Sequence, residues 1–142
     1  MTARTDLSCS IARGLSVIGQ PWTILILREA FLGVTRFAEF RGKLGIAPDM
    51  LTDRLGTLVE AGVLSREPYQ EPGERARDAY VLTPAGRDLL VVLASIQQWA
   101  DDHLPHEASP TMLRRTHYGR PVRVGFVDDY GHEVNDVRMI AR

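Results

Sequence analysis

The apolar positions near the start of the chain recur at helical spacing, in runs separated by glycine or proline. In residues 9–20 the apolar side chains stand three and four positions apart, at Ile11, Leu15 and Ile18. This spacing predicts an amphipathic helix that ends at Gly19. Pro21 suits the first position of a second helix, because the N–H that proline lacks has no helical partner there.

The second predicted helix runs from Trp22 to Leu32 and is apolar on most of its sides. Such a pattern is typical of a helix buried at the centre of a domain, and Gly33 ends it. Thr35 is expected to cap a short third helix. The inward side chains of that helix are expected to be Phe37, Phe40 and Leu44.

The fourth predicted helix opens at Pro48, directly after the tight connection Gly45-Ile46-Ala47. Its apolar side chains recur at steps of four and three, at Leu51, Leu55 and Leu58. These positions form one apolar stripe. Gly62 suits the left-handed position just past the end of the helix, where glycine is least penalised.

After the fourth helix the apolar pattern alternates with a period of two. It predicts two strands, Val63–Tyr69 and Asp78–Leu82. The polar residues 70–77 between them contain Pro72-Gly73, which indicates a hairpin loop. A proline after Thr83 then opens a long helix expected to reach about His103. Its apolar stripe consists of Leu89, Leu93, Ile96 and Ala100, flanked by Val92 and Trp99.

The last part of the chain differs in character from the helical part. Residues 104–110 are typical of a linker, and the alternation in residues 121–127 and 132–134 predicts a small β-hairpin. We therefore expect residues 1–104 to form the main domain. Residues 105–142 are expected to form a linker and a small C-terminal β-hairpin extension.

The order of elements is helix, helix, helix, helix, strand, strand, helix. Two short helices joined by a tight turn and followed at once by a hairpin match the winged helix-turn-helix plan. In that plan one helix enters the major groove and the hairpin reaches the DNA backbone or the minor groove. The tight turn alone is a weak signal, because other helical hairpins share it. The expected fold class is mainly α with a small β-hairpin wing (α+β).

Composition changes this interpretation little. The length of 142 residues predicts one domain. The net charge of −1 shows no excess of basic residues of the kind that many nucleic-acid binders have. All 17 basic residues except Lys43 are arginine, a bias that phosphate recognition and high-GC codon usage would both produce. With one cysteine, no apolar leader and no long apolar run, we expect a soluble cytoplasmic protein with no membrane partner.

Several longer motifs stand in order along residues 9–103. They are the lone Cys9, Ile18-Gly19-Gln20-Pro21-Trp22-Thr23-Ile24-Leu25-Ile26-Leu27-Arg28-Glu29, Arg36-Phe37-Ala38-Glu39-Phe40, Gly45-Ile46-Ala47-Pro48-Asp49-Met50-Leu51-Thr52-Asp53-Arg54-Leu55, Glu60-Ala61-Gly62-Val63-Leu64 and Tyr80-Val81-Leu82-Thr83-Pro84-Ala85-Gly86. Together they resemble the HxlR-type winged-helix transcriptional regulators, relatives of the MarR-type repressors. The resemblance implies a homodimer on near-palindromic double-stranded DNA. The first and last helices would form its interface, which we assign to Ile11, Leu15, Leu89, Leu93, Ile96 and Trp99.

Candidate DNA contacts follow from the expected fold. Arg36 and Arg54 are the natural contacts of the two short helices, with Pro48 and Thr52 on the groove-facing side. The alternative is that Arg36 or Arg54 pairs with a nearby carboxylate on a solvated face. Two further arginines, Arg75 and Arg77, lie in the hairpin and are expected to reach the backbone or the minor groove.

The chain departs from the family pattern at the fourth helix. Ala47 replaces the usual capping serine, a loss of about 1 kcal/mol. Asp49 and Asp53 stand where the family often carries basic or amide side chains, and carboxylates near phosphates weaken non-specific affinity. The alternative function is therefore a winged-helix protein-interaction module with little or no DNA binding. Salt-dependent binding to DNA distinguishes the two.

The chain offers no catalytic or metal-binding motif. It has no glycine-rich phosphate loop, no GxSxG elbow and no plausible Ser-His-Asp set, so we expect no enzyme and no cofactor. Longer family members end in a cysteine-containing hairpin with metal-ribbon spacing. Here Tyr118 and Tyr130 stand where cysteines are expected, so we expect a degenerate ribbon without metal.

Cys9 is a candidate oxidant or electrophile sensor, because the matching cysteine of the family often has that role. A place in the first helical turn, near Arg13, would stabilise its thiolate. The alternative is a small buried hydrophobic residue. A small-molecule effector is also left open, with Trp22 and Trp99 either lining its pocket or, as we favour, packing in the core.

Overall fold

The computed structural model describes residues 7–104, 106–108 and 110–141. Its contacts divide the chain into two compact units, residues 1–90 and 91–142. Residues 1–6, Pro105 and Ser109, on which parts of the leader and linker predictions rest, lie outside the described residues. The division after residue 104 stays a prediction.

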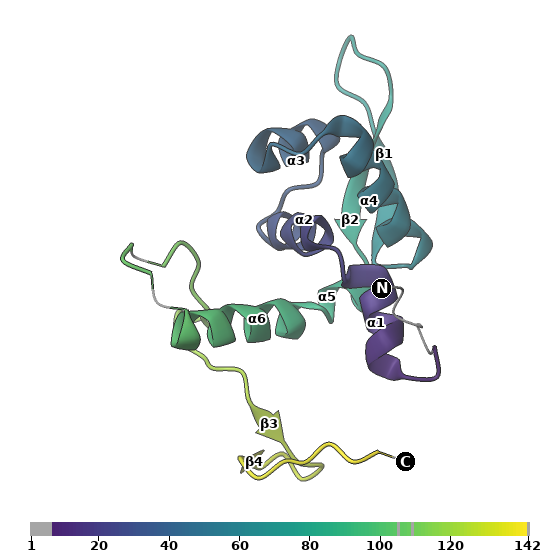
Figure 1. Cartoon of the computed structure of the whole chain (residues 1–142). Helices are drawn as coiled ribbons and strands as arrows, with labels where there is room; N and C mark the ends of the chain where they lie inside the picture. Colours follow the sequence, from purple (N-terminus) through teal and green to yellow (C-terminus); the bar gives the residue numbers. More distant parts are fainter. Residues whose placement is uncertain (1–6, 105, 109, 142) are drawn as a thin grey trace. The chain divides into compact units, whose positions relative to one another are not determined.

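The first unit contains four helices followed by a β-hairpin and one further helical turn (Figure 1). These elements are α1 (Ser10–Ile18), α2 (Pro21–Phe31), α3 (Phe37–Leu44), α4 (Pro48–Glu60), β1 (Leu64–Tyr69), β2 (Arg77–Leu82) and α5 (Pro84–Arg87). The two strands are antiparallel, in a register from Leu64 opposite Leu82 to Tyr69 opposite Arg77. The predicted winged helix-turn-helix order is confirmed.

The core of the first unit lies where α2, α3, α4 and β1 meet. Its fully buried apolar side chains are Ile26, Leu27, Phe40, Leu51, Leu55, Leu58 and Leu64. The predicted stripe of α4 is thus the buried face of that helix, and α2 is the central helix. Gly62 has φ 76°, the left-handed conformation predicted for the helix end.

The start of α3 differs from the prediction. Arg36, and not Thr35, is the N-cap residue, and no side chain caps the helix. The reason is that residues 35 and 36 are tied to the second strand of the hairpin. The Tyr80 N–H donates to the Thr35 carbonyl at 2.7 Å, and Arg36 forms an antiparallel bridge with Ala79.

The prediction of one unbroken helix after the hairpin is wrong. It is divided into α5 (Pro84–Arg87) and α6 (Leu90–His103). The predicted cap at Thr83 is confirmed, because its hydroxyl accepts from the Gly86 N–H at 3.0 Å. The break follows because the Leu89 N–H bonds to the Gly86 carbonyl, three residues back, at 3.1 Å. Leu89 therefore lies outside the helix that carries Leu93 and Ile96.

The second unit contains most of α6 and a C-terminal extension with two short antiparallel strands. They are β3 (Phe126–Val127) and β4 (Glu133–Val134), which confirms the predicted small hairpin with shorter strands than the alternation indicated. Polar side chains of α6 bind the extension: Gln98 and Val124 exchange two hydrogen bonds of 2.9 and 2.8 Å. Within the described residues of this unit, none is buried.

No single one of the described helices is long and apolar enough to cross a membrane. The pair α1 and α2 passes together by length and composition, but it is bent by 76°.

Candidate nucleic-acid interface

The exposed face of α4 is opposite its leucine stripe. Pro48 and Thr52, the two predicted groove-facing residues, are both exposed. Asp49 and Asp53 are exposed as well, so this face carries two carboxylates beside its candidate DNA contacts. Ala47 is the N-cap residue and makes no capping side-chain bond, as its side chain requires.

Arg54 lies at the side of this face and already has a partner. Its Nη1 is 2.6 Å from Oδ2 of Asp53, the preceding residue. The side chain is only 20% exposed, and its Nε is covered without a hydrogen-bond partner among the described residues. Arg54 therefore makes the ion pair with a nearby carboxylate that the sequence analysis gave as the alternative to a DNA contact.

Arg36 also pairs with a carboxylate, that of Glu71 in the hairpin loop. Its Nη2 donates to Oε1 of Glu71 at 2.7 Å, and the guanidinium carbon lies 4.2 Å from the centre of the Tyr69 ring. The hydrogen bond from Arg36 to Glu71 raises the pKa of the Arg36 guanidinium above its ordinary value. Both side chains remain nearly half exposed, at 45% and 46%.

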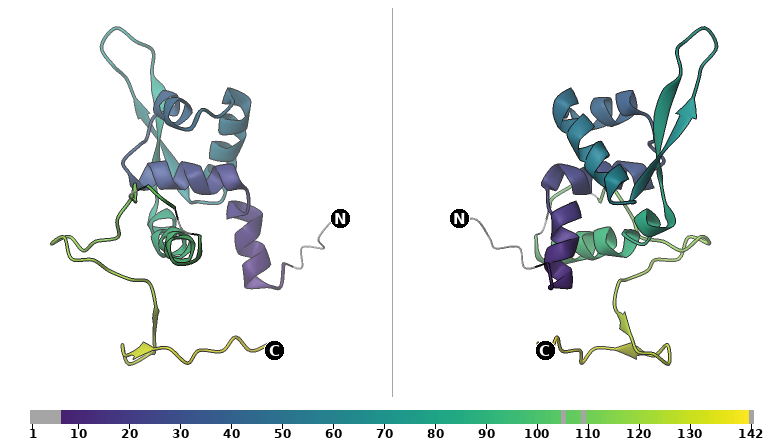
Figure 2. Two further views of the ribbon diagram at one scale, coloured as in Figure 1. Left: turned by 60° about the vertical axis from the view of Figure 1, so that its left-hand side comes forward. Right: turned by 90° about the vertical axis from the view of Figure 1, so that its right-hand side faces the viewer.

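The hairpin wing reaches beyond the helices of the first unit (Figure 2). Arg75 in its loop and Arg77 at the start of β2 are exposed, and neither guanidinium has a hydrogen bond or ion pair among the described residues. Two hydrogen bonds within the loop stabilise it. The Glu74 N–H donates to the Glu71 carbonyl at 3.0 Å, and Gln70 Nε2 donates to the Glu74 carbonyl at 2.8 Å.

Three residues of this surface were missed by the sequence reasoning. Tyr69 and Glu71 hold Arg36, and Arg66 on β1 lies 5.9 Å from the ring of Tyr80 on β2. The strand alternation contained a signal, because residues two apart share one face of a strand. It did not indicate which basic residue of another element that face would meet.

Cys9 is the N-cap residue of α1 and is exposed, so the alternative of a buried hydrophobic residue does not describe it. The backbone N–H groups of Ala12 and then Ile11 lower the pKa of its thiol, with a smaller contribution from Arg13. Its side chain makes no capping hydrogen bond. This electrostatic environment favours the thiolate, the reactive form of cysteine.

The residues assigned to a dimer interface differ in exposure. Ile11 and Leu15 of α1 are 58% and 59% exposed, and Trp99 of α6 is 59% exposed. Ile96 is also exposed, whereas Leu89 and Leu93 are half-buried. Trp99 is therefore not a core residue, contrary to the packing that we favoured for it.

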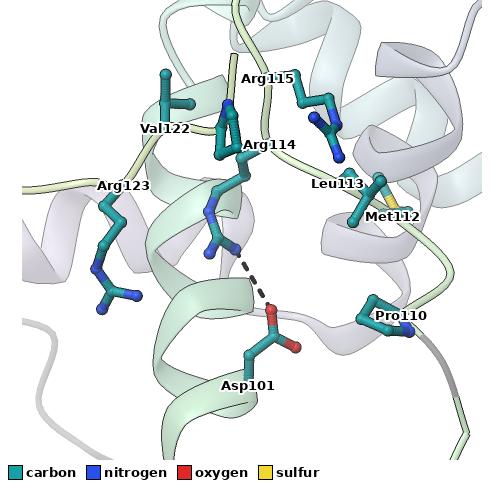
Figure 3. Close-up of a pocket in the computed structure, with 9 residues that line it drawn as sticks. Asp101, Pro110, Met112, Leu113, Arg114, Arg115, Val122 and Arg123 are labelled. Atoms are coloured by element: carbon teal, nitrogen blue, oxygen red, sulfur yellow. Dashed lines mark hydrogen bonds and ion pairs between the residues drawn. The ribbon is translucent and has the colours of Figure 1, made fainter. Parts of the chain in front are cut away.

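A cavity of about 310 Å³ lies in the second unit (Figure 3). Its walls are Asp101, Pro110, Met112, Leu113, Arg114, Arg115, Pro121, Val122 and Arg123. Arg114 reaches toward Asp101 at 3.4 Å, and Arg123 pairs with Asp102 at 2.8 Å, which lowers the pKa of the Asp102 carboxyl. These pairs give Asp101 and Asp102 a structural role. The small-molecule effector stays a prediction.

The extension contains two glycine turns next to the two tyrosines singled out in the sequence. Gly119 and Gly131 have φ angles of 82° and 83°, and each follows an exposed tyrosine, Tyr118 or Tyr130. Among the described residues, no group of three or more His, Cys, Asp or Glu side chains could hold a metal ion. The expectation that the protein binds no metal stays a prediction.

Known proteins are similar to this chain in sequence and in fold. The HxlR-like helix-turn-helix family matches residues 17–108. An uncharacterised HTH-type transcriptional regulator of Mycobacterium tuberculosis is 44% identical over 108 residues, 76% of this chain and 67% of that protein. The crystal structure of PA1607, described as "a Putative Transcription Factor", superposes with a TM-score of 0.80 at 37% identity, covering 99% of this chain and 100% of that one. The redox regulator HypR in its reduced form gives a TM-score of 0.61 at 28% identity, covering 68% and 95%.

The chain belongs to the HxlR-like helix-turn-helix family. The expected family and fold class are thereby confirmed. The protein is a transcriptional regulator of the helix-turn-helix type, and not an enzyme.

Proposed function

We propose that the protein acts as a homodimer that binds a near-palindromic DNA operator. In this proposal α4 enters the major groove, while the wing contacts backbone phosphates or the minor groove. The observation that carries the proposal is the pair Arg75 and Arg77. Both guanidinium groups stand exposed on a hairpin directly after the helix-turn-helix, without a carboxylate partner among the described residues.

Two exposed apolar surfaces support the homodimer. One is on α1, at Ile11 and Leu15, and the other is on α6, at Ile96 and Trp99. Exposed apolar side chains at regular helical positions are typical of interfaces with a partner. A two-fold dimer would present two copies of α4 to successive major grooves, about 34–36 Å apart.

The proposed signal is oxidation or electrophilic modification of Cys9. Its exposed position and lowered pKa favour reaction, and the neighbour HypR has structures described as a reduced and an oxidised redox regulator. With one cysteine per chain, the available products are an adduct, a sulfenic acid or a Cys9–Cys9 bridge between subunits.

Salt-dependent binding to DNA tests the proposal. The probes are a duplex from the region upstream of the gene and a mixed-sequence duplex of about 30 base pairs, long enough for two half-sites. The double variant Arg75→Ala/Arg77→Ala is expected to weaken binding to both. Because each phosphate contact releases counterions, its slope of log affinity against log salt should flatten by about two per subunit.

The matched control is Arg120→Ala/Arg138→Ala, which removes two exposed arginines from the C-terminal extension. It should leave the salt slope of the wild type unchanged. Equal slopes for the wild type and the wing variant would show that the wing does not contact DNA. Absence of salt-dependent binding in the wild type would favour the protein-interaction module.

A further inference from the structure

The contact between Arg36 and the wing is built from three residues: Arg36 at the N-cap of α3, Tyr69 at the end of β1 and Glu71 in the hairpin loop. Glu71 accepts from Arg36 Nη2 at 2.7 Å, and the Tyr69 ring lies 4.2 Å from the guanidinium carbon. The backbone of Arg36 is joined to β2 by its bridge with Ala79. The wing therefore holds both the main chain and the charged end of Arg36.

A carboxylate at this place resembles a backbone phosphate in the contact that it makes. Arginine donates to carboxylate and phosphate oxygens with the same planar N–H groups. Tyr69 faces the guanidinium through its ring, a contact that leaves the N–H edges available for oxygens. Because Arg36 and Glu71 are both nearly half exposed, an incoming phosphate can reach the same edges.

We propose that Glu71 is an internal competitor for a DNA backbone phosphate, and that Arg36 on the Tyr69 ring is the phosphate-binding site that it occupies. This inference rests on the proposed DNA-binding function and adds a regulator of affinity to it. On binding, the phosphate replaces the carboxylate at Arg36, and Glu71 turns to solvent. The pair thereby lowers affinity for every DNA sequence equally, since a phosphate contact carries no base information.

The cost of this competition is modest. Exposed ion pairs contribute little, and losing one changes affinity by at most roughly fivefold. The variant Glu71→Gln removes the charge and keeps an oxygen that can still accept from Arg36. It is expected to bind a mixed-sequence duplex about two- to fivefold more tightly near 0.1 M salt. Its salt slope should steepen slightly, because binding no longer breaks an exposed ion pair that added salt already weakens in the free wild type.

Glu74 provides the matched control. It lies three residues further along the same loop, is exposed, and its carboxylate has no ion pair among the described residues. Glu74→Gln removes the same charge, so it reports the general electrostatic gain. Its effect is expected to be smaller, with an unchanged salt slope. In an Arg36→Gln background, Glu71→Gln should have no larger effect than Glu74→Gln.

The outcomes separate this inference from the proposed function. If the wild type binds DNA with salt dependence but Glu71→Gln and Glu74→Gln behave alike, Glu71 is no competitor. Weaker binding by Glu71→Gln would show instead that Glu71 positions Arg36 for DNA, which also overturns the inference. If neither the wild type nor any of these variants binds DNA, the proposed function fails and the inference falls with it.

Discussion

The arginines of the candidate interface differ in what their side chains already contact. Arg36 and Arg54 hold carboxylates at 2.7 and 2.6 Å, so a phosphate must replace or share an existing partner. Arg75 and Arg77 have no such partner among the described residues. A phosphate contact made by the wing pair therefore adds an interaction instead of exchanging one. We expect these two arginines to contribute most of the salt dependence.

Cys9 should react with a thiol reagent while the protein is folded. Its pKa is lowered from the ordinary value by the amides of Ala12 and Ile11, so more thiolate is present at neutral pH than in an unperturbed cysteine. The rate of modification by iodoacetamide should rise as the pH increases through this lowered pKa. It should level off at a lower pH than for a model thiol peptide.

The control is Cys9→Ser, which should take up no reagent because it removes the single thiol of the chain. DNA affinity is then measured before and after modification of the wild type. A change that Cys9→Ser does not show supports the proposed signal. Full modification with unaltered DNA affinity would limit Cys9 to a reactive surface residue.

At the scale of elements, the joint between the hairpin and α5 depends on a glycine. A Cβ on Gly86 would overlap the Val63 carbonyl oxygen and lie 3.1 Å from Leu82 Cδ2. Gly86→Ala should therefore lower the free energy of unfolding by roughly 2–3 kcal/mol, because packed backbone cannot move aside freely. Thermal unfolding at a fixed protein concentration measures the change.

Gly56 in α4 is the matched position, because a Cβ there meets nothing within 4 Å. Gly56→Ala should raise the free energy of unfolding by up to about 1 kcal/mol through the higher helix propensity of alanine. If the two substitutions shifted stability equally, the close approach at Gly86 would not govern this joint.

Most elements of the first unit could be predicted because their signals are local. The leucines of α4 repeat at helical spacing, Pro48 and Gly62 mark the ends of that helix, and the hairpin alternates around a Pro-Gly turn. A local pattern fixes which face is buried once one core exists. For that reason the sequence could predict the helix-turn-helix and the wing, which carry the candidate site.

Two of the departures from the predictions come from long-range contacts, and one comes from a local turn. Thr35 has the side chain of a helix cap, but its carbonyl accepts from Tyr80, which extends the backbone up to Arg36. The stripe through Leu89 looks continuous, but the tight turn after Gly86 interrupts it. The partnership of Arg36 with Glu71 joins residues 35 positions apart, a distance that no periodic pattern contains.

At the scale of the whole molecule, the second unit lacks an independent core. None of its described residues is buried, and α6 carries Val91, Ile96 and Trp99 more than 45% exposed. A helix of this kind gains most of its stability from packing an apolar face. The α1 helix has the same character, since it contains no buried residue and exposes Ile11 and Leu15.

We therefore predict that the protein is a dimer in solution, with a mass of twice 15.9 kDa by light scattering during size-exclusion chromatography. Ile11→Glu and Ile96→Glu should each shift the mass toward the monomer. In a two-fold interface every substitution appears twice, so each places two carboxylates in an apolar contact. The first unit should keep its helical circular dichroism in Ile11→Glu, because α1 contributes nothing to its buried core.

Met139→Glu is the control, since it places the same charge on an 86% exposed apolar residue outside the assigned interface. It should remain dimeric. The dimeric state should also matter for DNA: a monomeric Ile11→Glu presents one α4 per molecule and should lose affinity for a two-half-site duplex far more than for a single half-site. A wild type of 15.9 kDa, or Ile11→Glu and Ile96→Glu variants that both remain dimeric, would remove α1 and α6 from the interface.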